Sequence, residues 1–481
     1  MADRSGPEYM GKAPIGTILL EFSTPTIIAS VIAATYNFVA RIFVGQTIGS
    51  VGIAALGVSF PIILIQLAFA MMVGTGASTL IAIELGRKQF DRAEKILGQG
   101  IFLYALFSAL FILLGLPFIE PLLRLFGATD EILPYAEEYL AIIIWGMFFS
   151  NMTFGVNNFI RSEGKPRFAM ITMIFSGLLN IVFAWLFLFV LKTGIWGAAM
   201  ANVMALIITS VWVSWLYLSG KTVLRWRLRY FRFHPALARD IIVYGMVPLA
   251  TQTCSSLVQA VQNNILRFYG AIYGVKIGLG AAQGSVLAIS TMATIFPISM
   301  LVLMPVLGLS QGMQPIIGYN VGARKPDRVW RTLCLSLRCS TVMCFLFVVL
   351  LITFPHLFLR PFIKSTDVFF VPVMALGAHA LRCMMLSFPA VGINVITSAY
   401  FQSHGRPILS FMLTIFRQLV FLIPVLFGLP WLLNRLGLFE PLDGVWSAYV
   451  ISDGMALVIS VILLLRECRK KRRIIAAARN Q

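Results

Sequence analysis

Three ionisable side chains fall near the middles of long apolar segments in the second half of the chain: Arg382, Arg417 and Asp453. A charged side chain at such a depth in a bilayer costs about 2.5–3.5 kcal/mol on insertion scales, so its presence needs a reason. A carboxylate there can bind and release a proton or a small cation, while an arginine sets its charge state. The alternative is a buried Asp–Arg pair that only fixes helix packing. Both interpretations stay open, and these three residues, together with Glu21, are our candidates for ion coupling.

Uncharged polar residues inside other apolar segments are candidates for contacts with a solute, although amides in an apolar core often bond one helix to another. Glu21 lies one turn inside the first apolar segment, where it is placed to accept protons near one membrane surface. Pro25 and Pro248 lie inside apolar segments and predict kinks that can act as hinges. The amides that we single out as candidates for a substrate cleft are Asn37, Asn180, Asn202, Gln259, Asn263 and Gln283.

The histidines and cysteines show no spacing that is typical of a metal site or a catalytic centre. The four histidines are scattered and form neither HxxxH nor HExxH. None of the six cysteines forms a CxxC pair, so we interpret them as packing residues. The sequence therefore predicts that the protein is not an enzyme and binds no metal and no cofactor beyond a coupling ion, either H⁺ or Na⁺.

Composition places these residues in a membrane. The chain has 481 residues, of which 59% are hydrophobic and only 12% are charged, and its mean hydropathy is +0.88. A soluble domain has about 25% charged residues, so this is a polytopic, all-α membrane protein. Apolar windows predict twelve transmembrane helices, at 15–42, 51–84, 93–117, 135–160, 167–191, 195–219, 237–270, 281–318, 328–354, 370–402, 407–433 and 444–466.

The cations orient these helices. An even number of spans puts both termini on one side, and the segments on that side hold 27 of the 38 Lys and Arg, against 8 on the other side and 3 within spans. The positive-inside rule then predicts a cell (cytoplasmic) membrane protein with both termini in the cytoplasm. It also accounts for most of the net charge of +19, so nucleic acid is not an expected partner.

An internal repeat divides the chain. Gly86-x-Lys88-x-x-Asp91-Arg92 recurs as Gly322-x-Arg324-x-x-Asp327-Arg328, displaced by 236 residues, and Ser162-x-Gly164-Lys165-Pro166 recurs as Ser403-x-Gly405-Arg406-Pro407, displaced by 241. Six spans per half make the halves parallel, a plan that many secondary transporters use. The expected parts are a cytoplasmic N-terminal segment (1–14), an N-lobe (15–219), a basic cytoplasmic linker (220–236), a C-lobe (237–466) and a basic cytoplasmic tail (467–481).

The repeated motifs also predict local structure. We expect Gly86 and Gly322 to end helices in the left-handed conformation. Asp91 is expected to cap the next helix, with Glu94 three residues later completing a capping box. The repeat leaves the centre of the first half without charge, because the positions matching Arg382, Arg417 and Asp453 are Ala141, Ser176 and Val203.

Several stretches resemble the multidrug and toxic compound extrusion (MATE) transporters. Residues 36–45, Tyr36-Asn37-Phe38-Val39-Ala40-Arg41-Ile42-Phe43-Val44-Gly45, look like helix 1 of that family. Residues 312–323, which begin Gly312-Met313-Gln314-Pro315, resemble its most recognisable stretch. Residues 400–407, with Arg417-Gln418 and Ser452-Asp453, are similar to its bacterial MepA-like branch. The resemblance implies a two-lobed antiporter of twelve helices that exports amphipathic compounds, usually organic cations, against inflowing protons or sodium ions.

The chain departs from the family at two acids. Helix 1 usually carries an Asp where this chain has Ala40, and many members have an Asp in helix 5 where this chain has Ala184, four residues after Asn180. These acids resemble the family's cation site in the first lobe, so their loss puts coupling in that lobe in doubt. A cation exporter without them is electrostatically awkward, which raises the standing of zwitterionic and anionic substrates.

The expected function is ion-coupled efflux of amphipathic small molecules by alternating access between the two lobes. The expected partners are those substrates and membrane lipids, and the protein is expected to be a monomer. One alternative is a lipid-linked precursor flippase of the same wider superfamily, whose cavity would use Arg267, Arg382 and Arg417. Another is a non-transporting or uncoupled membrane protein that kept the fold.

Overall fold

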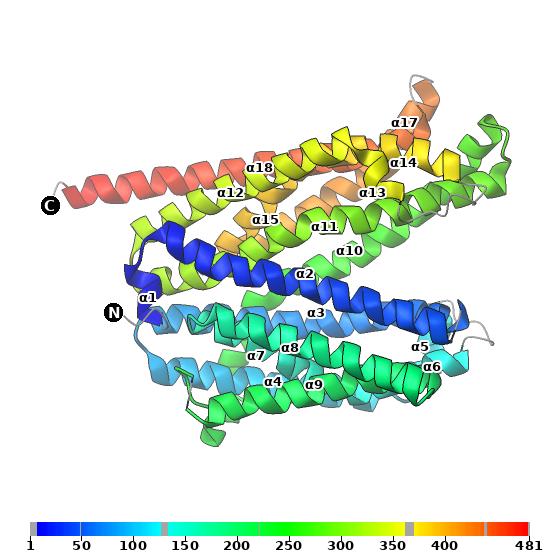
Figure 1. The fold of residues 1–481 in the computed structure, drawn as a ribbon. Coiled ribbons are helices and arrows are strands. Elements are labelled where there is room, and N and C mark those ends of the chain that lie inside the picture. The colour runs from blue at the N-terminus through cyan, green and yellow to red at the C-terminus, as the bar shows by residue number, and fades with distance from the viewer. Residues whose placement is uncertain are drawn as a thin grey trace. The chain divides into compact units, whose positions relative to one another are not determined.

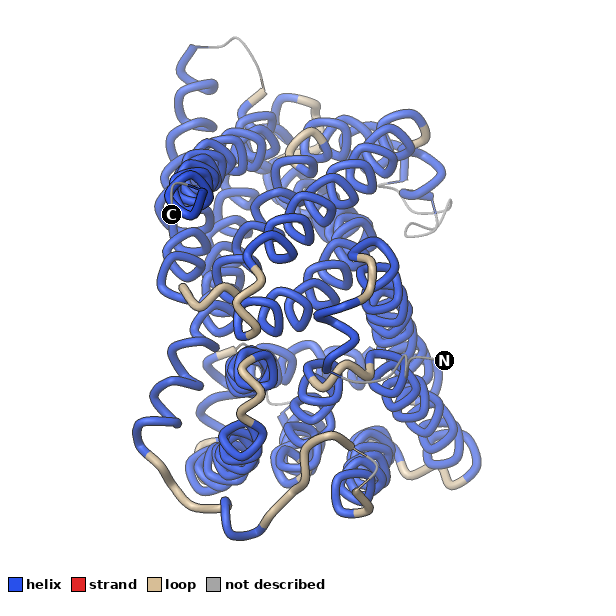
Figure 2. Tube along the Cα trace, turned by 90° about the vertical axis from the view of Figure 1, so that its left-hand side faces the viewer, coloured by secondary structure: helices blue, strands red, loops and turns tan. Residues whose placement is uncertain are grey.

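The computed structural model describes residues 7–48, 50–126, 133–220, 222–360, 370–436 and 440–479. Within these ranges every regular element is a helix (Figure 2). Ten helices are long and apolar enough to cross a membrane, and there are twelve spans when each of two bent pairs is counted as one. The predicted all-α fold of twelve transmembrane helices is confirmed.

The spans of the first half follow the predicted ranges closely (Figure 1). They are α2 (Ile15–Thr47), α3 (Ser50–Gly86), α4 (Phe90–Gly115), α6 (Leu133–Trp145) with α7 (Met147–Ser162), α8 (Pro166–Trp185) with the π-helix η1 (Leu186–Val190), and α9 (Gly194–Leu218). Two short helices accompany them, α1 (Pro7–Lys12) and α5 (Ile119–Leu125).

The spans of the second half also match. They are α10 (Pro235–Lys276), α11 (Ala281–Gly322), α12 (Pro326–Thr353), α14 (Phe370–Met385) with α15 (Phe388–Ser403), α16 (Pro407–Ile415) with the π-helix η4 (Phe416–Leu422) and α17 (Ile423–Leu436), and α18 (Pro441–Arg479). The short α13 (Pro355–Leu359) follows α12, and a 3-10 turn, η2 (Leu228–Tyr230), lies in the linker before α10.

Two spans are bent at equivalent places of the repeat. The pair α6 and α7 bends by 53° around Gly146, and the pair α14 and α15 bends by 46° around Leu386 and Ser387. Gly146 and Ser387 are 241 residues apart, which is the displacement of the neighbouring sequence motif. Apolar windows do not reveal such bends, because hydropathy is averaged along the whole span.

The chain packs into two compact units. Unit 1 contains residues 1–252, 311–333 and 402–408, and unit 2 contains 253–310, 334–401 and 409–481. An apolar core in unit 1 gathers around Leu123, Leu140 and Ala199, and one in unit 2 gathers around Leu287, Leu381 and Trp446. These units are defined by packing, whereas the predicted lobes are defined by the repeat, and the lobe boundaries stay predictions.

Glycines bring backbones together inside unit 1. The helices α3 and α11 meet at Gly86 and Gly322, where an added Cβ on Gly322 would lie 3.0 Å from the Gly86 Cα and would overlap the Ile83 carbonyl oxygen. The helices α3 and α10 meet at Gly76 and Gly245, where a Cβ on Gly76 would lie 3.0 Å from the Gly245 nitrogen. We call Gly76, Gly86, Gly245, Gly312 and Gly322 the glycine seam.

Two local expectations are wrong. The left-handed residues after α3 and α11 are Lys88 and Arg324, with φ of 61° and 54°, and not Gly86 and Gly322. The glycines are instead required for the close approach of the two helices. Asp91 does not cap α4, because α4 begins at Phe90 and the residue before it makes no side-chain cap bond.

Candidate functional site

Asp453 and Arg417 form an ion pair inside unit 2. The helices α18 and η4 carry them, with Arg417 Nη1 3.3 Å from Asp453 Oδ1. The side chain of Asp453 is 6% exposed and that of Arg417 is 25% exposed. Arg417 lies in a π-helical stretch, and π-bulges are frequent at functional sites. The structure therefore brings together two of the four predicted coupling candidates, which also include Arg382 and Glu21.

Hydrogen bonds hold the backbones around this pair. The Ser452 hydroxyl donates to the Arg417 carbonyl at 2.8 Å, and the Asn394 amide donates to the Asp453 carbonyl at 3.2 Å. Ser460 in turn donates to the Asn394 side-chain oxygen at 2.8 Å. The pair is thus tied through α15, η4 and α18 together, and a change in its charge acts on three helices.

The helix α10 joins the same polar region. The Tyr449 hydroxyl, one turn before Asp453, donates to Gln262 Oε1 at 2.6 Å, and Gln418 Nε2 donates to the Ser255 hydroxyl at 3.2 Å. Sequence reasoning missed Gln262 and selected its neighbours Gln259 and Asn263. Those two side chains are exposed, whereas Gln262 is buried. A count of the helical faces of α10 is the signal that separates them.

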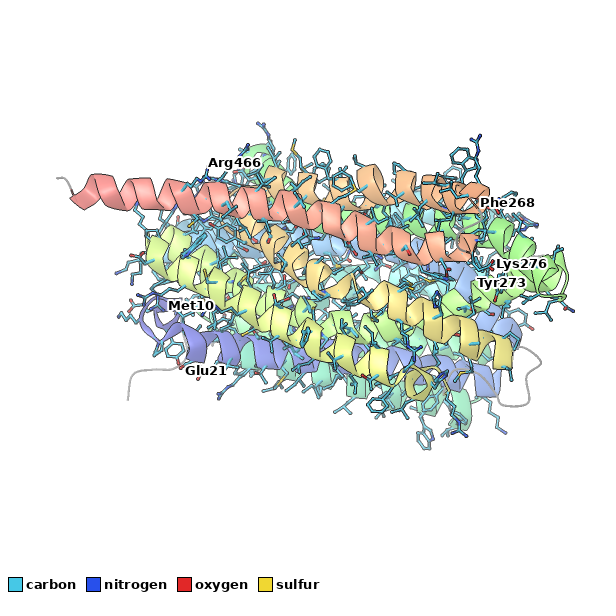
Figure 3. The ribbon with its side chains drawn as sticks, turned by 90° about the horizontal axis from the view of Figure 1, so that it is seen from above. Met10, Glu21, Phe268, Tyr273, Lys276 and Arg466 are labelled. Atoms are coloured by element: carbon cyan, nitrogen blue, oxygen red, sulfur yellow. The ribbon has the colours of Figure 1, made fainter. Side chains whose placement is uncertain are left out.

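The third coupling candidate, Arg382, lies on α14 with an exposed side chain. Its Nε donates to the Ile352 carbonyl at 3.3 Å, and among the described residues it forms no ion pair with Asp453. Glu21 is half-buried on α2 in unit 1 and is labelled in Figure 3. Gln283, on α11, is exposed.

The resemblance predicts an acid at two positions of the first half, and this chain has alanine at both. The polar candidates in that half are amides. Ala184 is buried on α8 and Ala40 is half-buried on α2, and these two helices pack along each other. Asn180 is 6% exposed, and its side-chain oxygen has no hydrogen-bond partner among the described residues. Asn202 is half-buried on α9, while the side chain of Asn37 lies outside the described residues.

The predicted hinge prolines lie inside continuous helices. Pro25 is in α2 and Pro248 is in α10. Next to Pro25, the Thr26 hydroxyl donates to the Phe22 carbonyl at 2.6 Å, whereas the carbonyl that loses its helical donor because of Pro25 is that of Glu21. The structure places both prolines as predicted, and their role as hinges stays a prediction.

The structure also shows a polar cluster that sequence reasoning missed. Glu163, in the turn between α7 and α8, is completely buried. Its carboxylate accepts hydrogen bonds from the Tyr217 hydroxyl at 2.7 Å and from the Val223 N–H at 2.9 Å. Burial raises the pKa of the Glu163 carboxyl to about 7, although the hydrogen bonds from Tyr217 and Val223 act in the opposite direction.

Acids of α4 hold the next part of the linker. Glu94 accepts a hydrogen bond from the Arg225 N–H at 3.1 Å and pairs with Arg227 Nε at 2.8 Å. The Tyr230 hydroxyl donates to Asp91 at 2.6 Å. Asp91 and Glu94 thus bind the linker rather than forming the expected capping box.

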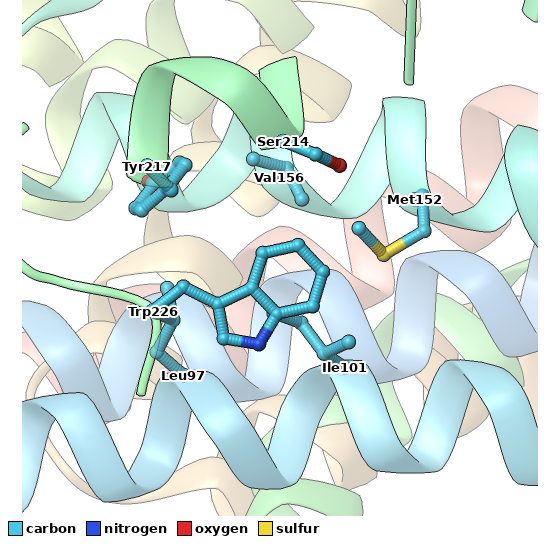
Figure 4. Close-up of a pocket in the computed structure, with 7 residues that line it drawn as sticks. All are labelled: Leu97, Ile101, Met152, Val156, Ser214, Tyr217 and Trp226. Atoms are coloured by element: carbon cyan, nitrogen blue, oxygen red, sulfur yellow. The ribbon is translucent and has the colours of Figure 1, made fainter. Parts of the chain in front are cut away.

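The indole of Trp226 packs the same linker into an apolar pocket of unit 1 (Figure 4). The free volume there is about 0 Å³, too little for a water molecule, whereas small-molecule sites typically offer about 300–1,000 Å³. We therefore assign this pocket to anchoring the linker. Its lining residues are Leu97, Ile101, Met152, Val156, Ser214, Tyr217 and Trp226.

Known proteins resemble this chain over nearly its whole length. The Multidrug export protein MepA of Staphylococcus aureus (strain MSSA476) is 23% identical over 463 residues, which are 95% of both chains. The Multidrug export protein MepA of Staphylococcus haemolyticus (strain JCSC1435) is 24% identical over 460 residues, which are 95% of this chain and 94% of that one.

Solved structures share the fold. A multidrug resistance MATE family transporter of the MOP superfamily, in an outward-facing conformation, superposes with a TM-score of 0.86 at 23% identity and covers 96% of this chain and 98% of its own. A MOP superfamily transporter from Pyrococcus furiosus Vc1, described as having a binding pocket of reverse polarity, gives a TM-score of 0.85 at 23% identity, with coverage of 95% and 96%.

The sequence profile of the MatE family matches residues 25–186 and 247–427, which include most spans of both halves of the repeat. The match covers more than half of the chain, and it agrees with the apolar helices and with the fold described above. This chain therefore belongs to the MatE family of multi-pass membrane transporters.

Proposed function

We propose that this transporter is a proton-coupled antiporter that exports amphipathic small molecules, and that Asp453 is its coupling acid. The observation that carries the proposal is the buried pair of Asp453 with Arg417. Family membership and the MepA relatives support efflux of small molecules. The MepA relatives are named multidrug export proteins, which implies several substrates. Several substrates require a pocket that binds by apolar contact rather than by one fixed pattern of hydrogen bonds.

The composition of the site favours a proton over a sodium ion. A sodium ion needs several oxygen ligands, and Arg417 already occupies Asp453 Oδ1 and repels a second cation. A proton needs only one carboxylate oxygen, and it neutralises Asp453 while leaving the charge of Arg417 in place.

Electrostatics then give the sign of coupling. When Asp453 is ionised, the pair with Arg417 is neutral, and a cationic or zwitterionic solute can approach it. When a proton binds Asp453, the guanidinium is left uncompensated and repels a cation. Proton and cation therefore exclude each other, which is what antiport requires. An anion would be attracted by the same protonation, which produces symport, so we propose zwitterionic or cationic substrates for the export mode.

The N-terminal half would supply neutral polar contacts to the solute. The side-chain oxygen of Asn180, which has no partner among the residues that the structure describes, is an acceptor next to the position where Ala184 replaces an expected acid. An acceptor without a full charge suits an ammonium group that leaves again without a large desolvation cost. We propose that Asn180 and Asn202 contact the substrate and that Asp453 alone titrates.

Alternating access in this scheme requires the glycine seam to open and close. The seam holds α3 against α10 and α11 at the end of unit 1 that carries the basic turns. We propose that this end lies in the cytoplasm, in accordance with the positive-inside rule, together with both termini. The protein would then open toward the cytoplasm when Gly86 and Gly322 separate.

A lipid-linked precursor flippase is less well supported. Its cavity would need free cations for a pyrophosphate, whereas Arg417 pairs with Asp453 and Arg382 donates to a backbone carbonyl. The third arginine considered for that cavity, Arg267, has an exposed side chain on α10. The observed contacts of these arginines therefore favour the antiporter.

The test is transport into and out of vesicles that contain the purified protein, with a pH gradient and a sodium gradient imposed separately. A dye cation and a zwitterionic amphiphile serve as substrates, and protein-free vesicles are the control. The proposal expects the pH gradient alone to drive substrate against its own gradient. Transport driven by sodium alone would overturn the assignment of the proton, and the absence of any driven transport would overturn antiport.

A further inference from the structure

A hollow of about 780 Å³ lies in unit 1 between the turn after α3, the turn after α11 and the short helix α1. Five cationic side chains and one acidic side chain line it. Because all of these residues belong to unit 1, the hollow is a feature of a single compact part of the chain. The charged residues are Glu8, Lys12, Arg87, Lys88, Arg324 and Lys325.

The helix α1 forms a fixed wall of the hollow. Asn320 Nδ2 donates to the Met10 carbonyl at 3.0 Å, and Lys325 Nζ donates to the Gly11 carbonyl at 2.8 Å. Arg328 donates to the Ala13 carbonyl at 2.6 Å. These bonds hold the carboxyl end of α1 against the end of α11, so the hollow is built by the fold and is not a gap beside a loose terminus.

Several of the lining charges already have partners. Lys12 pairs with Glu8 at 2.7 Å, which also neutralises that acid, and Arg87 pairs with Glu84 at 3.0 Å. In contrast, Lys88 and Arg324 are exposed, and neither forms an ion pair with any residue that the structure describes. These two cations are related by the repeat, since they are 236 residues apart.

The backbone at Lys88 and Arg324 indicates why these cations matter. Each follows the end of its helix in the left-handed conformation. The Lys88 N–H donates to the Leu85 carbonyl, and the Arg324 N–H donates to the Val321 carbonyl, both at 3.1 Å. Glycine is the usual residue at this position because a side chain makes the conformation costly.

The other pair of repeat-related turns uses glycine. Gly164 after α7 and Gly405 after α15 are left-handed, with φ of 88° and 86°, and each is followed by its cation one residue later. Of these four repeat-related turns, two thus have glycine and two have a cation at the left-handed position. Both of these two cations, Lys88 and Arg324, line the hollow. Strain of this kind is typical of binding sites.

We propose that the hollow is an anion site that takes a phosphate group, with Lys88 and Arg324 contributed by the two halves of the repeat as its principal ligands. Guanidinium and ammonium groups are the side chains that bind phosphate oxygens most strongly. The apolar stretches of α3 and α11 run up to Gly86 and Gly322, directly before these turns, and basic pockets at the ends of spanning helices bind anionic headgroups. A phosphate can come from an anionic lipid or from solution.

The variants that test the site are Lys88→Gly and Arg324→Gly, singly and together. Each removes a cation and also relieves the left-handed strain, so a loss of binding cannot be attributed to a damaged turn. Lys192→Gly is the matched control, because Lys192 is also left-handed, with a φ of 51°, and does not line the hollow. The readouts are the thermal unfolding midpoint in detergent and the number of phospholipids retained in native mass spectrometry.

The probes are phosphatidylglycerol, neutral phosphatidylcholine and inorganic phosphate, each titrated at constant ionic strength. We expect phosphatidylglycerol to raise the unfolding midpoint of the wild type and of Lys192→Gly. We expect the double variant to bind this lipid at least about tenfold more weakly than the wild type does. A rise with phosphatidylglycerol alone assigns the site to a lipid headgroup, and a rise also with inorganic phosphate assigns it to a free phosphate. The proposal is overturned if neither anion raises the midpoint, or if the double variant responds as the wild type does.

Discussion

Gly86 and Gly322 face each other across the contact of α3 with α11, although they are 236 residues apart in the sequence. Because this spacing is the displacement of the repeat, the two residues are equivalents that meet each other. The neighbouring glycines show the same symmetry. Gly76 on α3 packs against Gly245 on α10, and its repeat equivalent, Gly312 on α11, packs against Ser23 on α2. This pattern is what a pseudo-two-fold axis through the Gly86–Gly322 contact produces.

The first prediction concerns this contact. Gly86→Ala and Gly322→Ala each place a Cβ onto a backbone carbonyl of the facing helix, and neither backbone can give way as a flexible side chain would. We expect each variant to lose about 1–3 kcal/mol of stability, which is the usual cost of overpacking. The measurement is the thermal unfolding midpoint of the purified protein.

The matched control for the seam is Gly57→Ala, in the same helix α3. No atom lies within 4 Å of an added Cβ at Gly57. Because alanine favours a helix over glycine by about 1 kcal/mol, this control should raise the midpoint or leave it unchanged. Equal midpoints for Gly86→Ala and Gly57→Ala would mean that the seam does not need its glycines.

The second prediction separates the structural role of the ion pair from its coupling role. Asp453→Asn leaves the half-buried Arg417 guanidinium without its carboxylate, and Arg417→Gln leaves the buried Asp453 carboxylate without its guanidinium. We expect each single variant to cost about 2–4 kcal/mol of stability. The double variant removes both charges, so its unfolding midpoint should return most of the way to that of the wild type. If the double variant is as unstable as the sum of the single variants, the two side chains do not act as a pair.

A third prediction follows from the position of Arg382. Its side chain is exposed and donates to the Ile352 carbonyl. Arg382→Gln should therefore change the free energy of unfolding by no more than about 0.5 kcal/mol and should leave proton-driven transport unchanged. The measurements are the unfolding midpoint and the initial rate of transport under a pH gradient. Loss of driven transport at unchanged stability would restore Arg382 to the coupling site.

Much of the fold could be predicted from the sequence because lipid imposes one rule on every span. Each of the twelve predicted ranges corresponds to a single helix, to a helix with a π-helical stretch or to a bent pair, since about twenty apolar residues must satisfy their backbone groups within the segment. Gly164 and Pro166 mark a helix end and the next helix start as expected. The bends at Gly146 and Ser387 could not be predicted, because they depend on packing between helices.

The site was predicted less completely. Asp453 and Arg417 were found because charge is rare in apolar segments, and rarity is visible in a sequence. The error at Asp91 and the omission of Glu163 have one cause, which is that both acids bind the linker far along the chain. A capping box is a local pattern, whereas contacts with Val223 and Tyr230 depend on how the linker folds back onto unit 1.

The fourth prediction concerns pH and Glu163. Its folded-state pKa of about 7 lies above the ordinary value of 4.5, so the folded protein keeps a proton that the unfolded chain releases between these values. Stability should therefore fall as pH rises through about 4.5–7, by about 3 kcal/mol in total from this group. In Glu163→Gln this decline should be absent, as unfolding midpoints measured from pH 5 to 8 will show.

The control for Glu163 is Glu138→Gln, which changes an exposed acid of α6. It should keep the decline of the wild type across the same pH range. A decline of equal size in Glu163→Gln would mean that Glu163 is ionised in the folded protein throughout the range.

The most direct measurement of the coupling role compares driven transport with exchange in vesicles that contain Asp453→Asn. The control is Asp443→Asn, which changes an acid near the start of the same helix that pairs with the exposed His379. We predict that Asp453→Asn loses transport driven by a pH gradient but still exchanges labelled for unlabelled substrate, while Asp443→Asn does both. Full proton-driven transport by Asp453→Asn would contradict the account.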